Sequence, residues 1–211
     1  SYMVRGARKP RAKLKASLFQ PLTLLELEVY YKEKSSLQNI KEARNAYVFS
    51  STPFDIRKSS VTMFLSDLLT KTIKEEEANP GLFQFLDVMV RKLDQHDDGI
   101  ADFHLHFMVH LSKYLGFFPQ GKYNPASSFF DLIEGHFCSG QPQHLHYLDP
   151  RLSMQFSKLI HSHPLEPISL ALSRDDRNQL LEQSINYFLL HYDGLQEIQS
   201  HHVLREIFDN P

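Results

Sequence analysis

Histidine is the residue type that first suggests chemistry in this sequence. The chain holds 12 histidines among its 211 residues, and His104, His106 and His110 form the tightest group. Imidazole is a common zinc ligand, and on a helix His106 and His110 lie one turn apart, so they could share an ion. His104 and His106 point in nearly opposite directions on such a helix. Because a third ligand is still missing, we predict no metal and no cofactor, with a metalloenzyme left as an alternative.

Nucleophilic catalysis finds little support in the sequence. Cys138 is the only cysteine, and the chain has neither a Gly-x-Ser-x-Gly elbow nor a glycine-rich phosphate loop. A single cysteine beside abundant histidine meets only the loosest description of a thiol enzyme. We therefore expect no enzymatic activity. One cysteine also allows no intramolecular disulfide, which fits a reducing, intracellular compartment.

Positive charge is concentrated at the start of the chain. Its first fifteen positions hold no acidic residue and six basic ones, namely Arg5, Arg8, Lys9, Arg11, Lys13 and Lys15. Each phosphate that such residues neutralise releases counterions, so a basic arm binds polyanions with salt-dependent affinity and little sequence preference. Tyr2 and Phe19 could add stacking on single-stranded bases. We predict that these six residues bind DNA, although a solvated terminus would explain the same charges.

The overall composition is that of a globular protein outside the membrane. Hydrophobic residues make up 42% and charged residues 23% of the chain, and the formal net charge is −2. No segment approaches the ~20 apolar residues of a membrane span, and the start lacks the apolar core of a signal peptide. We expect a cytoplasmic protein.

Residues 1–52 have the pattern of β-structure. Leu25–Val29 alternates apolar and polar residues, as a half-buried strand does. A second extended stretch is expected over residues 37–49, with inward positions at Ile40, Ala43, Tyr47 and Phe49. The chain opens like the end of a strand and without methionine, so we expect an upstream piece.

Residues 53–211 change to a helical period. Helices are expected over residues 54–73, 82–93 and 100–115, and two or three more are expected near residues 150–161, 174–193 and 200–208. Gly116 and Gly194 are expected to end two of them. A Gly-, Pro- and Ser-rich insertion over residues 117–150 contains one expected hairpin, at residues 129–137. The predicted class is α+β, with a β-rich domain before a mainly helical one.

The helix over residues 100–115 could bind a partner. Its apolar stripe is flanked by His106, His110 and Lys113 and consists of Ile100, Phe103, Phe107, Leu111 and Leu115. An apolar groove with a positive rim fits an acidic peptide with an aromatic end. An ordinary core helix with a polar edge is the alternative interpretation.

A resemblance to a known family rests on segments in a fixed order. They are residues 18–30 (LFQPLTLLELEVY), 37–43 (LQNIKEA), 103–117, 172–174, 186–191 (NYFLLH) and 200–204. Together these segments resemble the RecO family of DNA repair proteins over essentially the whole chain. The resemblance implies an N-terminal OB-fold, apparently lacking its first strands here, and a helical C-terminal domain. It also implies a recombination mediator that binds single- and double-stranded DNA, anneals strands and helps load RecA. The implied partners are RecR and the acidic C-terminal tail of single-stranded DNA-binding protein.

Two departures from the family pattern matter. Many relatives carry a cysteine zinc site after the Leu-Gly step, whereas Cys138 stands alone here. Packing within residues 117–147 must then replace that site. Some relatives place an arginine near the position of His106, and a histidine is only partly charged near neutral pH. Tail docking would then depend more on Lys113. A protein–protein adaptor without direct DNA contact is the alternative function.

Overall fold

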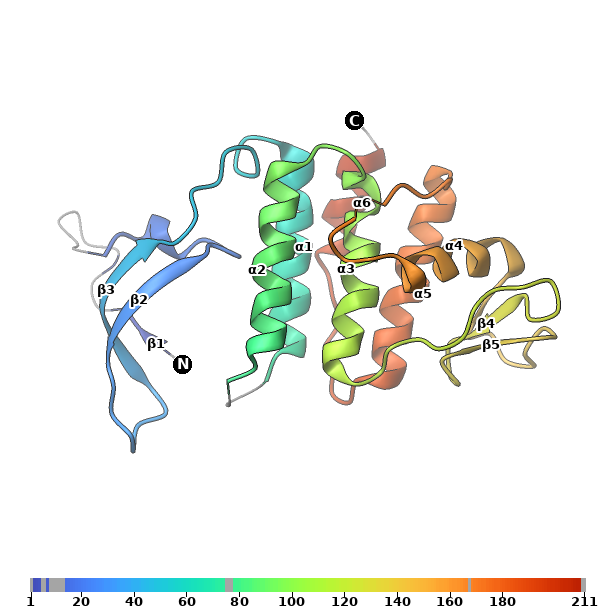
Figure 1. Ribbon diagram of the computed structural model, residues 1–211, viewed down its shortest axis with the longest axis horizontal. Helices are drawn as coiled ribbons and strands as arrows, with labels where there is room; N and C mark the ends of the chain where they lie inside the picture. Colours follow the sequence, from blue (N-terminus) through green and yellow to red (C-terminus); the bar gives the residue numbers. More distant parts are fainter. Residues whose placement is uncertain (1, 5–6, 8–13, 75–77, 167, 210–211) are drawn as a thin grey trace. The chain divides into compact units, whose positions relative to one another are not determined.

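The computed structural model describes residues 2–4, 7, 14–74, 78–166 and 168–209, and it divides into two compact units between Ser50 and Ser51. Figure 1 shows a small sheet in the first unit and a mainly helical body in the second. The predicted α+β class is confirmed at this level.

The N-terminal unit is built on a small sheet in the order β1-β3-β2. Strand β1 (Tyr2–Met3) runs parallel to β3 (Gln38–Asn45), and β2 (Leu25–Tyr30) runs antiparallel to β3. A short 3-10 helix, η1 (Ala16–Phe19), precedes β2. The described strands form an open sheet, so the barrel that an OB-fold requires is not closed in this part of the chain.

A β-bulge explains how two predicted inward residues share a face. Leu27 pairs with Ala43 and Val29 pairs with Ile40, so Lys41 is an extra residue in β3. Residues three apart in a regular strand point to opposite faces, and the extra residue restores Ile40 to the face of Ala43. Both are half-buried. The predicted stretch ends earlier than expected, because β3 stops at Asn45, and Tyr47 and Phe49 contact each other beyond it.

The second unit contains the helices that the periodicity predicted, with small shifts at their ends. They are α1 (Ile56–Thr72), α2 (Pro80–Gln95), α3 (Ile100–Leu115), α4 (Pro150–His161), α5 (Arg174–His191) and α6 (His201–Asp209). Side chains of Asp55, Asn79, Asp149 and Ser173 cap the starts of α1, α2, α4 and α5 by accepting backbone N–H groups. Gly116 ends α3 in the left-handed conformation, at φ 90°, as predicted. Helix α5 ends at His191, before Gly194.

Helix α3 is the central element of this unit. It packs against α1, α2, α4 and α5, and Figure 1 shows it between α1–α2 and α5. Every residue from Asp102 to Ser112 is buried. A helix enclosed in this way must be apolar on nearly all sides, and Leu105, Met108 and Val109 supply apolar faces outside the predicted stripe.

The insertion between α3 and α4 forms a small β-lobe. Strands β4 (Phe129–Asp131) and β5 (His136–Cys138) make the predicted antiparallel hairpin, and β6 (Tyr147–Leu148) adds to the free side of β4. Phe130 is fully buried and makes edge-to-face contacts with Phe137 and Phe156. Aromatic packing therefore connects the lobe to α4.

Candidate functional site

The basic arm is only partly within the described structure. Arg5, Arg8, Lys9, Arg11 and Lys13 lie outside the described residues. Lys15 is exposed at the start of η1, where its carbonyl accepts the N–H of Leu18. The DNA-binding role of all six stays a prediction.

The cations on the strands of the sheet are already neutralised. Arg44 forms a two-pronged ion pair with Glu26, at 2.6 and 2.9 Å, and Lys41 pairs with Glu28. The hydrogen bond and charge of Glu26 raise the pKa of Arg44, and Glu28 does the same for Lys41. Because each cation has a carboxylate partner, this face offers phosphates little net positive charge.

The end of β2 presents a different surface. Tyr30 is 57% and Tyr31 75% exposed, and exposed Lys32 and Lys34 follow in the turn between β2 and β3. Gln38 holds this turn, since its side-chain oxygen accepts the Lys32 N–H and its amide donates to the Lys32 and Ser35 carbonyls. Neither tyrosine was assigned a role from the sequence; their position where the strand meets the polar segment Lys32–Lys34 was the available signal.

The histidines of α3 belong to the interior. His106 is 0% exposed, and neither of its ring nitrogens has a hydrogen-bond partner among the described residues. Its ring meets that of His110 edge to face at 4.6 Å. Burial lowers the pKa of His106 to about 3, helped by the nearby side chains of His110, Lys92 and His163. Such a histidine is neutral near pH 7.

His110 and His104 are in similar surroundings. His110 is buried with its Nε2 3.4 Å from Ser162 Oγ, and burial lowers its pKa to about 4. His104 lies against Phe64 and Phe208, and burial lowers its pKa to about 3. Neither side chain carries positive charge near neutral pH.

These positions change the predicted peptide groove. Of its three residues, His106 and His110 are buried and Lys113 is exposed, in the last turn of α3. The expectation of a partly charged His106 at a groove edge does not fit a side chain enclosed on all sides. Lys92, on the preceding helix, is also engaged, because its ammonium donates to the carbonyls of Pro164 and Glu166. Of the three residues predicted to flank a groove, Lys113 alone is exposed to a partner.

His144, His146 and Cys138 form structural contacts. His144 Nε2 lies 3.1 Å from Asp131 Oδ2, and His146 Nδ1 lies 2.9 Å from the Asn186 amide. In the described ranges no group of three or more His, Cys, Asp or Glu side chains is placed to hold a metal ion. Burial raises the pKa of the Cys138 thiol, which is opposite to what a reactive cysteine needs.

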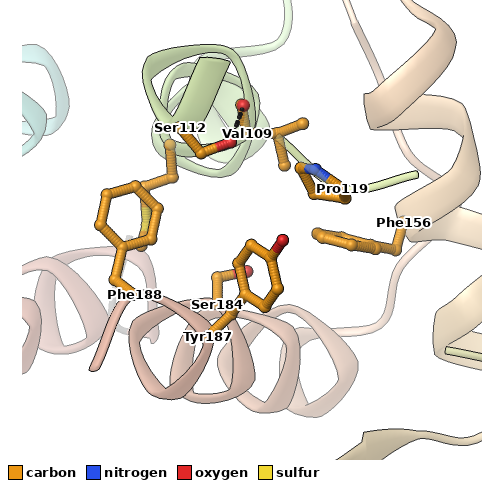
Figure 2. Close-up of a pocket in the computed structure, with 8 residues that line it drawn as sticks. Val109, Ser112, Pro119, Phe156, Ser184, Tyr187 and Phe188 are labelled. Carbon is orange, nitrogen blue, oxygen red and sulfur yellow. Dashed lines mark hydrogen bonds between the residues drawn. The ribbon is translucent and has the colours of Figure 1, made fainter. Parts of the chain in front are cut away.

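A small cavity lies between α3, α4 and α5 (Figure 2). Val109, Ser112, Phe156, Ser184 and Phe188 are among its lining residues, and Ser112 Oγ donates to the Val109 carbonyl. Its volume of about 10 Å³ matches roughly one water molecule, which is far too small for an organic cofactor. Ser184 Oγ, buried here without a described partner, is the polar atom that a water would satisfy.

None of the described helices is long and apolar enough to cross a bilayer.

Comparison with known proteins gives consistent matches along the whole chain. Residues 1–49 match the family model "Recombination protein O N terminal" and residues 53–200 match "Recombination protein O C terminal". DNA repair protein RecO of Flavobacterium psychrophilum is 38% identical over 210 residues, covering 99% of this chain and 86% of the relative. The protein of the same name from Phocaeicola vulgatus is 34% identical over 208 residues with the same coverage, and that of Bacteroides fragilis is 34% identical over 210 residues, covering 99% and 87%. The chain belongs to the RecO family of DNA repair and recombination proteins.

Proposed function

We propose that this chain is a recombination mediator that binds single- and double-stranded DNA, promotes annealing of complementary strands and helps load RecA together with RecR. The observation that carries this proposal is that both family models match, one on each compact unit. The matched relatives are named DNA repair proteins. No chemical step on DNA is part of the proposal, and the proposed place of work is the bacterial cytoplasm.

The N-terminal unit is the proposed DNA-binding part. Residues 1–50 hold ten Lys and Arg against four Asp and Glu, and six of the ten lie in the first fifteen positions. Lys41 and Arg44 are neutralised by carboxylates, so we propose that phosphates contact the basic arm and the turn lysines Lys32 and Lys34 instead. The OB-fold implied by the family is proposed for this unit, and its bulged β2–β3 pair is compatible with the curvature of such a barrel.

A DNA titration tests the proposal directly. Fluorescence anisotropy with a labelled single strand, and with the matching duplex, should show binding that weakens steeply as salt rises. Replacing Arg8, Lys9 and Arg11 together by alanine should weaken binding to all sequences about equally and lower the salt slope. A flat salt dependence would contradict electrostatic binding. Annealing is measured separately, by the rate at which two complementary labelled strands pair.

The helical unit is the proposed partner-binding part. RecR and the acidic tail of single-stranded DNA-binding protein are the proposed partners. For the tail, we propose a contact at Lys113, with His106 and His110 supporting α3 from inside. Lys113→Ala should weaken binding of a tail peptide, measured by anisotropy. Lys122→Ala is the matched control, because Lys122 is also exposed but lies outside α3.

A protein–protein adaptor is the second candidate function. It is favoured by the charge of the helical unit, because residues 51–211 hold thirteen Lys and Arg against twenty-one Asp and Glu. A net acidic surface repels DNA and is more suited to protein partners. If the full chain binds RecR but shows no DNA binding at low salt, the adaptor function replaces the mediator function.

A further inference from the structure

The end of β2 combines exposed aromatic rings with exposed lysines. Tyr30 closes the strand and Tyr31 follows it, and their exposed fractions of 57% and 75% are high for large side chains. Exposed tyrosines of this kind lose favourable burial unless a partner covers them. An aromatic ring that is open to solvent offers a flat surface on which a nucleic-acid base can stack.

The cations beside these rings differ from those on the strands. Lys32 and Lys34 are exposed, and neither ammonium forms an ion pair with another described residue. Lys41 and Arg44, by contrast, are held by Glu28 and Glu26. Exposed Glu33 lies between these two lysines, so residues 32–34 offer phosphates one net positive charge next to the tyrosines.

The turn is also held in one shape. Gln38 of β3 bonds both the N–H and the carbonyl of Lys32 at 2.8 and 2.9 Å, and it reaches the Ser35 carbonyl as well. The Ser35 hydroxyl donates to the Leu37 carbonyl. A turn fixed by its own hydrogen bonds presents its lysines at a constant position relative to Tyr30, so binding requires little ordering of the backbone.

We propose that Tyr30, Tyr31, Lys32 and Lys34 form a binding site for single-stranded nucleic acid, in which the tyrosines stack on bases and the lysines contact the adjoining phosphates. This inference rests on the proposed DNA-binding function and adds a substrate preference to it. Bases within a duplex are already stacked on each other, so the rings gain a partner only from an unpaired strand. The site therefore favours single strands, whereas the basic arm binds either form.

The test compares full-length variants on two probes, a labelled oligothymidine strand and a labelled duplex of equal length. Tyr31→Ala should weaken single-strand binding about tenfold and leave duplex binding nearly unchanged, because the loss of stacking affects unpaired bases alone. Tyr31→Phe should retain the affinity of the original chain, since it keeps the ring.

Lys32→Ala and Lys34→Ala should each reduce the single-strand salt slope by about 0.7, whereas Tyr31→Ala should not change it. Phe83→Ala, at an exposed aromatic residue of α2, is the control and should change neither affinity.

Tyr31 lies outside the strand, so its replacement should leave the sheet intact; Tyr30→Ala provides a second reading of the same site. Single-strand affinity that is unchanged in both tyrosine variants would overturn the inference while leaving the proposed function in place. An equal loss on strand and duplex would also overturn it, because it would show a general electrostatic or folding effect. If the original chain binds neither probe at low salt, the proposed DNA-binding function itself fails.

Discussion

The two units of this protein differ in where their charged and apolar side chains are placed. In the N-terminal unit Leu14 is the one apolar side chain among the described residues that is buried almost completely, whereas the helical unit buries many, including Phe64, Phe107 and Phe188. The first unit is rich in basic residues and the second in acidic ones. A small sheet with exposed tyrosines and lysines is suited to surface recognition, and a helical unit with a large buried core is suited to rigid support.

Low pH should produce the largest difference in folding stability between the two units. His104, His106 and His110 are buried and neutral, with pKa values lowered by burial to about 3, 3 and 4, whereas unfolded histidines titrate near 6.5. Because the folded values are depressed, their contribution to stability is complete above pH 6.5 and is lost as pH falls toward 4. At pH 5 each unfolded histidine gains about 2 kcal/mol by protonation, or about 6 kcal/mol for three.

Urea unfolding at pH 7 and pH 5, followed by circular dichroism, measures this loss. Residues 1–50 contain no histidine, so hydrogen exchange should show the acid effect in the helical unit first. His106→Phe removes one titrating group and should reduce the pH dependence by about a third. An unchanged pH dependence in this variant would show that His106 is not the buried, neutral group described here.

Truncating a core side chain should give the second-largest difference, because it should lower the free energy of unfolding more in the helical unit than in the sheet. Phe107 is completely buried in α3, and Phe107→Ala should lower the free energy of unfolding by about 3–5 kcal/mol through lost burial and a residual cavity. Leu27 of β2 is already 36% exposed, so Leu27→Ala should cost about 1 kcal/mol or less. Urea denaturation of both variants tests the difference. Similar losses would mean that the sheet has a core as well packed as that of the helices.

The sequence predicted the elements well because local patterns determine them. Alternation over Leu25–Val29 and helical spacing in residues 53–211 reflect which side chains must face inward, and Gly116 marks a helix end because its φ is positive. The opening of the chain was expected to be the end of a strand, and β1 lies there, but its parallel pairing of Tyr2 with Gln38 was not predicted, because two residues contain too little pattern to specify a partner.

The burial of α3 on all sides could not be predicted from a single apolar stripe in its sequence. The spacing of apolar residues predicted one apolar face with His106 and His110 at its polar edge, as for a helix at the surface. Packing by α1, α2, α4 and α5 encloses the other faces as well, which is a tertiary effect. Leu105, Met108 and Val109 were the signal of a central helix, since they make its sequence apolar nearly all round. The tyrosines at the end of β2 were missed because they are more exposed than a strand pattern suggests. In this short sheet no neighbouring element among the described residues covers the strand end.

A buried lysine near the start of the helical unit should give a smaller effect. Lys58 is 1% exposed and donates to Ser51 Oγ at 2.7 Å and to the Asp94 carbonyl at 3.0 Å, and it pairs with Asp97 at 2.9 Å. Lys58→Met should lower the free energy of unfolding by about 1–3 kcal/mol, since the carbonyl and hydroxyl lose a donor while Asp97 stays hydrated. Arg57→Met is the control, because Arg57 is exposed and pairs with its neighbour Asp55. Equal urea midpoints for the two variants would contradict a structural role for Lys58.

The ion pairs of the sheet should give the smallest change in stability but a measurable one in binding. Glu26 and Arg44 are both largely exposed, so Glu26→Gln should leave the urea midpoint unchanged, as is usual for surface pairs. The substitution frees the Arg44 guanidinium, and one uncompensated charge should raise DNA affinity roughly twofold at low salt. Anisotropy with the labelled duplex measures this, with Glu182→Gln as control, because its pair with Arg205 lies in the acidic helical unit. A gain from Glu26→Gln but not from Glu182→Gln would assign DNA contact to the sheet unit. Equal gains would mean that net charge alone sets the affinity, and the functional contrast between the units would then disappear.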